Sequence, residues 1–596
     1  MEQGSFPSRT WFTTRRSQYE PLMRSLRISL LLGLLLGLPF ATGRLAFSQF
    51  GAYPHNDDFL YARCAQIMAE EHRYQHISMI GSLTATVAAH SAWGALICSP
   101  LEFSYANLHL SVAIIGWIGA VCVFAAGRQL GASHGVAFIT ALTLVVGPYY
   151  YGMSFTFMTD VTAAALVAIS STAYFMGLKK QSRLWLLAGA VGATAALWTR
   201  QTHLVVIVFP LLVLTLQAKE TNNWKKTSLA MLLSCLLPIL GYCVYELGWL
   251  LPGNDNRLPR VSVRQYNLAY VRHCLLYVYQ ASILTGFVTL PLMPLMLAAI
   301  RHTTPHLQTH IRRWMGALAV MVSLTFLAIF LAKSGRLYIT QATGYILHNG
   351  HFGPILLADQ HDPGRWADMG GVEWPVMIWQ ILTLGAIANL GLLAWWVAFT
   401  VWEWRTDRVD ACSRVVSCSA IGLLAIIPTA MLGLLLVIET LYDRYWMLFY
   451  PAIFLFLLTR FASRTKSLPA WTWGASAILL SGMFAMSFVF THDFLAWNQA
   501  RGKQVEQWLS AGLTPAEFDA GSGINGWYRS LEDPDTWPRP GDKTLYWRGL
   551  ADVALSIGPR EGWEEVDQLT WHSWAVGREC KIYVIQRNTL DAPTGP

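Results

Sequence analysis

The segment Leu26–Phe47, LRISLLLGLLLGLPFATGRLAF, decides the class of fold. At 1.5 Å per residue, a helix of this length crosses a hydrocarbon core of roughly 30 Å. A signal peptide would have a shorter apolar region of roughly 7 to 15 residues followed by a clean small-residue cleavage site, which is not found after this segment. The segment therefore predicts an uncleaved first transmembrane helix.

The composition extends this interpretation to the whole chain. Of the 596 residues, 54% are hydrophobic and only 13% are charged, which is too apolar for an ordinary soluble protein. Further apolar runs lie at residues 108–126, 136–150, 161–177, 184–198, 203–216, 228–250, 275–300, 315–331, 376–402, 416–438, 446–458 and 471–490. The sequence thus predicts an all-α polytopic membrane protein with about 13 transmembrane helices.

Basic residues predict the orientation of these helices. They recur at every second boundary, for example at Arg24, Lys179, Lys225, Arg312 and Arg405. By the positive-inside rule these boundaries are cytoplasmic, so the opposite loops and the C-terminal tail face outward. We therefore expect a multi-pass protein of the plasma membrane, the inner membrane of a bacterial cell. The net charge of +8 follows from this topology and gives no support to nucleic-acid binding.

An acidic pair follows the first span, in AYPHNDDFLYARCAQIMAEEHRY at residues 52–74. After Asp57 and Asp58, apolar side chains recur from Phe59 to Met68 at nearly helical spacing, which predicts an amphipathic helix lying on the outer surface. An aspartate can simply cap such a helix, because its carboxylate accepts hydrogen bonds from the first backbone N–H groups. Two adjacent acids exceed what one cap needs, so a functional role stays open beside capping.

Three other polar motifs fall on the same side of the membrane. They are FMTDV with Asp160, TRQT with Arg200, and DRYWMLFYP with Arg444 and Tyr445. A charge near membrane depth is costly and usually faces a cavity or a partner. The structural alternatives are a helix cap for Asp160, a snorkelling or ion-paired side chain for Arg200, and an interfacial aromatic belt for Tyr445.

Together these motifs resemble a known family. DDFLYARCAQIMAE, FMTDV, TRQT and DRYWMLFYP are similar to signatures of the polyprenyl-phosphate-sugar-dependent membrane glycosyltransferases with the GT-C fold, a superfamily that includes protein O-mannosyltransferases and aminoarabinose transferases. The resemblance is to bacterial members. It implies a GT-C-like hexosyl- or pentosyltransferase, which moves a sugar from a polyprenyl-phosphate donor to a lipid, glycan or protein acceptor outside the cytoplasm.

The resemblance also implies roles for single residues. Asp57 matches the first acid of the family's pair and would be the general base, whereas Asp58 stands where the family usually has Glu and would orient the base or bind a metal. Asp160 would support the acceptor side or a metal. Arg200 and Arg444, with Tyr445, would bind the donor phosphate, since a guanidinium fork suits phosphate oxygens.

Two further assignments stay open at this point. His90, in VAAHSAWG, falls roughly where the family places a phosphate-contacting His or Lys before paired prolines, but the prolines are missing here. A lone His on an apolar stretch is more often a structural residue. An Mg²⁺ or Mn²⁺ ion at Asp57, Asp58 and Asp160 is neither required nor excluded, because three carboxylates are not a full ligand pattern.

Hydropathy divides the chain into two predicted domains. Residues 1–490 form the transmembrane glycosyltransferase domain, with a first outer loop at 48–107 that carries the amphipathic helix. Residues 491–596 form a small extracytoplasmic α/β domain, with short strands expected within 544–558 and 580–588. This domain would serve as a scaffold over the active-site mouth or recognise the acceptor.

Two other classes of function fit the same helices. No Walker-type loop is found, which argues against an ATP-driven pump. A secondary transporter remains an alternative, as does a non-catalytic scaffold of the cell envelope. A transporter site lies near the bilayer midplane, whereas the acids here gather at one face, which favours the glycosyltransferase.

Overall fold

The computed structural model of the chain describes most of its residues. Described are residues 10–55, 57–75, 86–221, 224–246, 268–333, 374–406, 411–437, 443–462, 464, 468–532, 551–556, 558 and 561–588. Part of the first expected strand, at residues 544–550, lies outside these ranges.

Helices dominate this structure, and they follow the apolar runs of the sequence. The first half contains α1 (Thr10–Leu35), α2 (Leu38–Ala46), α3 (Asp58–Glu71), α4 (Ala88–Leu101), α5 (Tyr105–Leu130), α6 (His134–Val146), α7 (Pro148–Met153), α8 (Thr159–Lys180), α9 (Arg183–Leu197), η1 (Gln201–Ile207), α10 (Val208–Thr221), α11 (Trp224–Glu246) and α12 (Leu268–Val288). The second half contains η2 (Leu290–Leu292), α13 (Met293–Thr303), η3 (Thr304–His306), α14 (Thr309–Ala332), α15 (Val376–Arg405), α16 (Ala411–Val437), η6 (Asp443–Phe449), α17 (Tyr450–Phe461), α18 (Ala470–Ser510) and α19 (Ser522–Glu532).

The predicted polytopic helical fold is confirmed. Among the described residues, nine helices are long and apolar enough to cross a membrane, and the bent pair α12 and α13 raises this number to ten. The apolar runs at 136–150, 184–198 and 446–458 also form helices, α6, α9 and α17, but these have only 13, 15 and 12 residues. At 1.5 Å per residue, each is too short to cross a core of roughly 30 Å alone.

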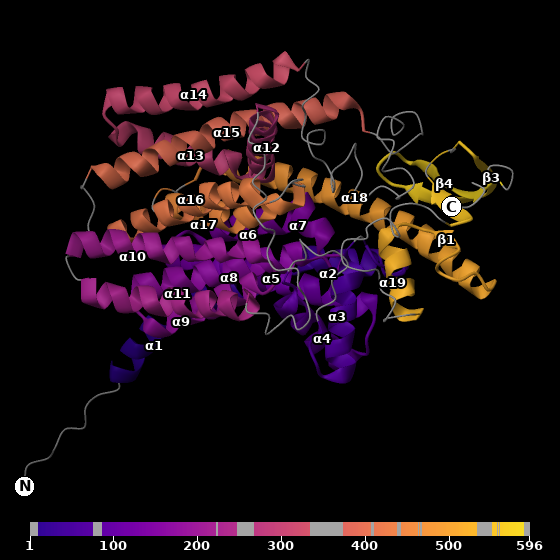
Figure 1. Ribbon diagram of the computed structural model, residues 1–596. Coiled ribbons are helices and arrows are strands. Elements are labelled where there is room, and N and C mark those ends of the chain that lie inside the picture. Colours follow the sequence, from indigo (N-terminus) through magenta and orange to yellow (C-terminus); the bar gives the residue numbers. More distant parts are fainter. Residues whose placement is uncertain are drawn as a thin grey trace, which may run out of the picture.

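Figure 1 shows how these helices are arranged. The long helices run side by side as one bundle, and α3, α4, α19 and the strands gather at one end of it. The predicted helix after the acidic pair is α3, but it does not lie on the surface. Phe59, Leu60 and Cys64 are buried because α3 packs against α4 and α19. Its apolar positions therefore contact protein rather than lipid headgroups.

The C-terminal part combines the C-terminal half of α18 with a small sheet, as expected for an α/β unit. The strands β1 (Phe518–Asp519), β2 (Val553–Ser556), β3 (Trp563–Ser573) and β4 (Arg578–Arg587) lie in the order β1-β2-β4-β3. Strand β1 is parallel to β2, and the other pairs are antiparallel. Val505 and Trp508 of α18 share an apolar core with Ile582 and Val584 of β4.

Helix α18 connects this unit directly to the bundle. It is a single helix of 41 residues, and the proposed domain boundary between residues 490 and 491 falls within it. Asp493, on α18, accepts hydrogen bonds from the backbone N–H groups of Trp574 (2.7 Å) and Ala575 (3.1 Å) and from the Ser573 hydroxyl (2.5 Å). The β3–β4 turn is thereby fixed to the helix.

Candidate active site

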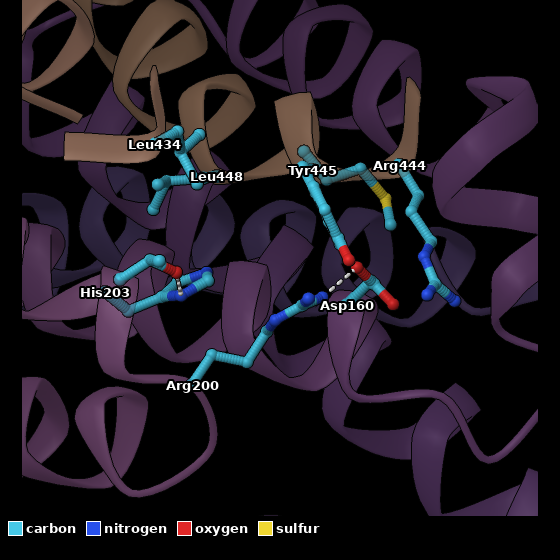
Figure 2. Close-up of a pocket in the computed structure, with 9 residues that line it drawn as sticks. Asp160, Arg200, His203, Leu434, Arg444, Tyr445 and Leu448 are labelled. Carbon is cyan, nitrogen blue, oxygen red and sulfur yellow. Dashed lines mark hydrogen bonds and ion pairs between the residues drawn. The ribbon is translucent and has the colours of Figure 1, made fainter. Parts of the chain in front are cut away.

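A cavity lies where the start of α8, the end of α9 and the segment η6 meet. The empty space here, including the part open to solvent, is about 290 Å³, and its lining is drawn in Figure 2. Its lining combines polar side chains with an apolar wall: Asp160, Arg200, Thr202, His203, Leu434, Arg444, Tyr445, Met447 and Leu448. Four of the seven residues singled out from the sequence, Asp160, Arg200, Arg444 and Tyr445, therefore meet in one place.

Helix ends bring these four residues together. Asp160 lies in the first turn of α8, Arg200 follows the end of α9, and Arg444 and Tyr445 lie in the 3₁₀ segment η6. The end of α9 is tied to the start of α4, because the Thr86 hydroxyl donates to the carbonyl of Leu197 at 2.6 Å and the Ala89 N–H to that of Trp198 at 3.1 Å. Arg200 itself is extended, with φ −153° and ψ 129°.

Two arginines lie close to the same aromatic ring. Arg200 forms an ion pair with Asp160, and its guanidinium carbon lies 4.7 Å from the centre of the Tyr445 ring. The guanidinium carbon of Arg444 lies 5.5 Å from the same ring. All three charged side chains are largely buried, with exposed fractions of 15% for Arg200, 2% for Asp160 and 3% for Arg444. Coulomb interactions are stronger here than in water.

Asp57 stands at the edge of this group. Its carboxylate Oδ2 lies 3.8 Å from Arg444, and 43% of its side chain is exposed. Asp57 occupies the N-cap position of α3, yet its side chain makes no cap hydrogen bond. The structure thus does not support capping as the reason for this carboxylate.

Asp58 points the opposite way, into the protein. It is fully buried, and its two oxygens accept hydrogen bonds from the backbone N–H groups of His55 (2.6 Å) and Phe157 (3.3 Å). Burial raises the pKa of Asp58 well above its usual range, although the two backbone hydrogen bonds act in the other direction. Asp58 therefore connects the segment before α3 to the segment before α8. Its contacts favour a positioning role.

His90, like Asp58, does not line the cavity. Its ring stacks on Phe157 with 4.1 Å between ring centres, and its two nitrogens are bonded to the Thr162 hydroxyl and the Phe157 carbonyl, each at 3.0 Å. Burial lowers the pKa of His90 to about 4, so the ring is neutral near pH 7. This placement favours a structural role over contact with a phosphate.

Sequence reasoning missed five residues of the cavity wall: Thr202, His203, Leu434, Met447 and Leu448. His203 is buried and lies three positions after Arg200, at the start of η1. The backbone N–H of His203 donates to the carbonyl of Arg200 at 3.0 Å, so this turn brings His203 to the cavity beside Arg200. The sequence held no signal for this contact apart from the closeness of the two residues in the chain.

The carboxylates do not converge as metal ligands. Asp57 faces Arg444, Asp58 bonds backbone N–H groups, and Asp160 is paired with Arg200. Among the described residues, no group of three or more His, Cys, Asp or Glu side chains could hold a metal ion. The three acids therefore do not fit an Mg²⁺ or Mn²⁺ site in this arrangement.

Comparison with solved structures finds remote likenesses. ArnT from Cupriavidus metallidurans, in the apo state and bound to undecaprenyl phosphate, is 15% identical with a TM-score of 0.41, over 95–96% of this chain and 98–99% of that one. The archaeal oligosaccharyltransferase AglB from Archaeoglobus fulgidus, in complex with an inhibitory peptide and a dolichol-phosphate, is 10% identical with a TM-score of 0.39, over 78% of this chain and 56% of that one. Arabinosyltransferase EmbB from Mycobacterium smegmatis is 9% identical with a TM-score of 0.32, over 80% of this chain and 42% of that one.

No protein-family model matches the chain, and no curated protein matches it. The solved structures it resembles include two enzymes named for glycosyl transfer and two complexes with an isoprenoid phosphate. At such low identities and scores these are likenesses of overall arrangement, so the assignment of a function depends on the site itself.

Proposed function

We propose that this chain is a membrane glycosyltransferase that moves a hexosyl or pentosyl residue from a polyprenyl-phosphate donor to an acceptor outside the cytoplasm. The observation that carries the proposal is the convergence of Arg200, Arg444 and Tyr445 on one cavity, with Asp57 at its edge. The acceptor is a lipid, glycan or protein that offers a hydroxyl group. No step of this proposal requires a bound metal.

The cavity suits a phosphate that carries a long apolar chain. Arg200 and Arg444 supply two guanidinium groups to it, and Leu434 and Leu448 supply an apolar wall away from Arg444 (Figure 2). Guanidinium groups form strong, directed hydrogen bonds with phosphate oxygens and stay charged at any relevant pH. The apolar wall would take up the first isoprene units next to the phosphate.

The proposed reaction uses these groups as follows. Asp57 accepts the proton of the acceptor hydroxyl, whose oxygen forms a bond to the anomeric carbon of the sugar. The bond between that carbon and the phosphate oxygen breaks, and its electron pair stays on the polyprenyl phosphate. The phosphate thereby changes from a diester with one negative charge to a monoester with two. Arg200 and Arg444 lower the barrier because they bind this increasing charge more tightly than the starting one.

Asp160 and Tyr445 hold the arginines in position for this step. Asp160 is paired with Arg200, so the guanidinium is directed before the donor arrives. Tyr445 lies against both guanidinium groups, and its ring face attracts cations. A fixed pair of arginines loses little conformational entropy when the phosphate binds.

The position of the site disfavours a transporter. Asp57, Asp160, Arg200 and Arg444 all lie at or next to the ends of helices. A transporter would hold its charged groups near the middle of the spanning helices. A site at one face suits an acceptor that arrives from the aqueous side.

Donor consumption tests the proposed function directly. The purified protein in lipid nanodiscs is given a panel of undecaprenyl-phosphate monosaccharides together with an envelope extract of the source cells as acceptor. We expect one donor to be converted to undecaprenyl phosphate, as measured by liquid chromatography and mass spectrometry. If no donor is consumed and undecaprenyl phosphate does not bind, the proposed function is overturned.

The predicted orientation of the chain in the membrane can be tested by cysteine labelling. Single cysteines are placed at the exposed positions of Lys180, Arg405 and Lys581 in a cysteine-free background. Because the first two belong to the basic boundaries and Lys581 to the sheet, a membrane-impermeant maleimide should label position 581 in intact cells and positions 180 and 405 only after permeabilisation. The reverse pattern would place the active site in the cytoplasm.

A further inference from the structure

The segment before α3 is held by a distant part of the chain. Tyr53 precedes Asp57 by four residues, and it contacts the C-terminal half of α18 in three ways. Its hydroxyl donates to Glu506 Oε1 at 3.0 Å, and its backbone carbonyl accepts a hydrogen bond from Asn498 Nδ2 at 3.2 Å. Its ring lies directly on Gly502.

The contact with Gly502 leaves no room for a larger residue. A Cβ atom built on Gly502 would lie 2.3 Å from the Tyr53 ring, well inside the distance that real Cβ atoms keep. Gly502 is buried and lies within a helix, where glycine costs roughly 1 kcal/mol relative to alanine. This glycine therefore has a packing reason, which is the close approach of Tyr53.

A second contact of the same kind follows on the other side of Asp57. Phe59 is fully buried, and its ring lies on Gly526 of α19, where a Cβ atom would again come within 2.3 Å. Helix α19 is in turn fixed near α18, because Arg501 donates to the carbonyl of Ala520 at 3.1 Å, just before the start of α19. On each side of Asp57, an aromatic ring thus packs against a glycine of the C-terminal part.

We infer that Tyr53, Gly502, Phe59 and Gly526 form a clasp that positions Asp57 for proton transfer. The inference rests on the proposed function and names the part of the chain on which that function depends. Asp57 has a partly exposed side chain, so the fixed backbone on both sides of it determines where its carboxylate lies. These four are positioning residues, since they act through Asp57. The C-terminal part is then a component of the active site and not a separate binding domain.

The Gly502→Ala variant tests the clasp, with Gly482→Ala as its matched control. Gly482 lies in the same helix, and a Cβ atom there would have nothing within 4 Å, so the control reproduces the change in helix propensity without a clash. Because displacing a catalytic group by about 1 Å can cost 10²-fold, we expect turnover of the donor to fall about 10- to 100-fold in Gly502→Ala only. Undecaprenyl phosphate should bind both variants within about twofold of wild type.

Hydrogen–deuterium exchange shows whether the clasp itself has opened. We expect faster amide exchange in residues 51–61 of Gly502→Ala and an unchanged rate in Gly482→Ala. The double variant Gly502→Ala/Tyr53→Ala should be no slower than Tyr53→Ala alone, because the added methyl group then has no ring to displace. Tyr53→Phe, which keeps the ring and loses only the hydrogen bond to Glu506, should retain most of the turnover.

Failure of the clasp and failure of the proposed function give different results. Unchanged exchange at residues 51–61 in Gly502→Ala, or faster exchange with full turnover, would overturn the clasp while the glycosyltransferase assignment stands. A wild-type protein that neither binds undecaprenyl phosphate nor consumes any donor would overturn the proposed function, and with it the role of the clasp in catalysis.

Discussion

Replacing Asp57 by Asn is expected to lower donor turnover by roughly 10²- to 10⁴-fold, the range typical for loss of a general base. Asn has nearly the same shape but cannot accept the proton of the acceptor hydroxyl. Undecaprenyl phosphate should still bind, because Arg200 and Arg444 remain in place, and thermal stability should change little, because the pair of Asp57 with Arg444 is 3.8 Å long and partly exposed on the Asp57 side. The measurement is turnover and binding in parallel, on purified protein.

Asp58→Asn serves as the contrasting variant. Asp58 is buried and accepts two backbone hydrogen bonds, so an amide at this position turns its NH₂ group toward one of the N–H donors. We expect a loss of about 1 to 3 kcal/mol in stability, which is the cost of a buried group left unsatisfied. A stable and fully active Asp57→Asn protein would contradict the assignment of the base and direct the search to Asp160.

Replacing Arg444 by Ala is expected to weaken binding of undecaprenyl phosphate by roughly 10- to 100-fold, because a hydrogen bond to a charged group contributes roughly 1.5 to 3 kcal/mol. Binding of undecaprenol, which lacks the phosphate, should not change. Arg444→Lys should restore only part of the affinity, since a single ammonium cannot reproduce the planar fork. Equal affinity of wild type and Arg444→Ala for the phosphate would exclude this role.

A test of Arg200 requires a second substitution that removes the charge of its partner, Asp160. Its removal leaves the buried carboxylate of Asp160 without its cation, and breaking a buried ion pair typically costs about 3 to 5 kcal/mol. We therefore expect Arg200→Ala to unfold at a lower temperature, and Arg200→Ala/Asp160→Asn to regain stability while binding of undecaprenyl phosphate stays weak. Recovery of binding in the double variant would show that Arg200 is a structural residue only.

The helical fold could be predicted because hydropathy is a local property of the chain. Every apolar run found in the sequence is mostly helical where the structure describes it, including the three whose helices are too short to cross a bilayer alone. The break between α6 and α7 at Gly147 and Pro148 shows the limit of this reasoning, since one apolar run there makes two helices. Proline can interrupt a helix within a run whose mean hydropathy stays high.

The site could be predicted only in part. Asp160, Arg200, Arg444 and Tyr445 stood out because charged or polar groups at membrane depth are rare. Adjacent acids, by contrast, gave no sign that Asp57 would be partly exposed and Asp58 fully buried. This difference arises from contacts with Phe157 and with the C-terminal part, which are far away in the sequence.

The glycines of the clasp were invisible to sequence reasoning for a related reason. Gly502 and Gly526 have no reactive side chain. They matter because the rings of Tyr53 and Phe59 pack directly on them, and these rings precede them by more than 400 residues. The predicted roles of the C-terminal part were a scaffold or a site for the acceptor. The contacts of Tyr53 and Phe59 with this part favour the scaffold, which would hold the backbone on both sides of Asp57.

The length of α18 has a mechanical consequence. A continuous helix of 41 residues is about 60 Å long, and one half of it lies among the apolar helices while the other half carries Asn498, Gly502 and Glu506. Hydrophobic helices adjust their tilt to the thickness of the bilayer. A change in the tilt of the half of α18 that lies among the apolar helices would move the half that contacts Tyr53. We therefore expect the rate of donor turnover to vary with the acyl-chain length of the lipids in reconstituted membranes.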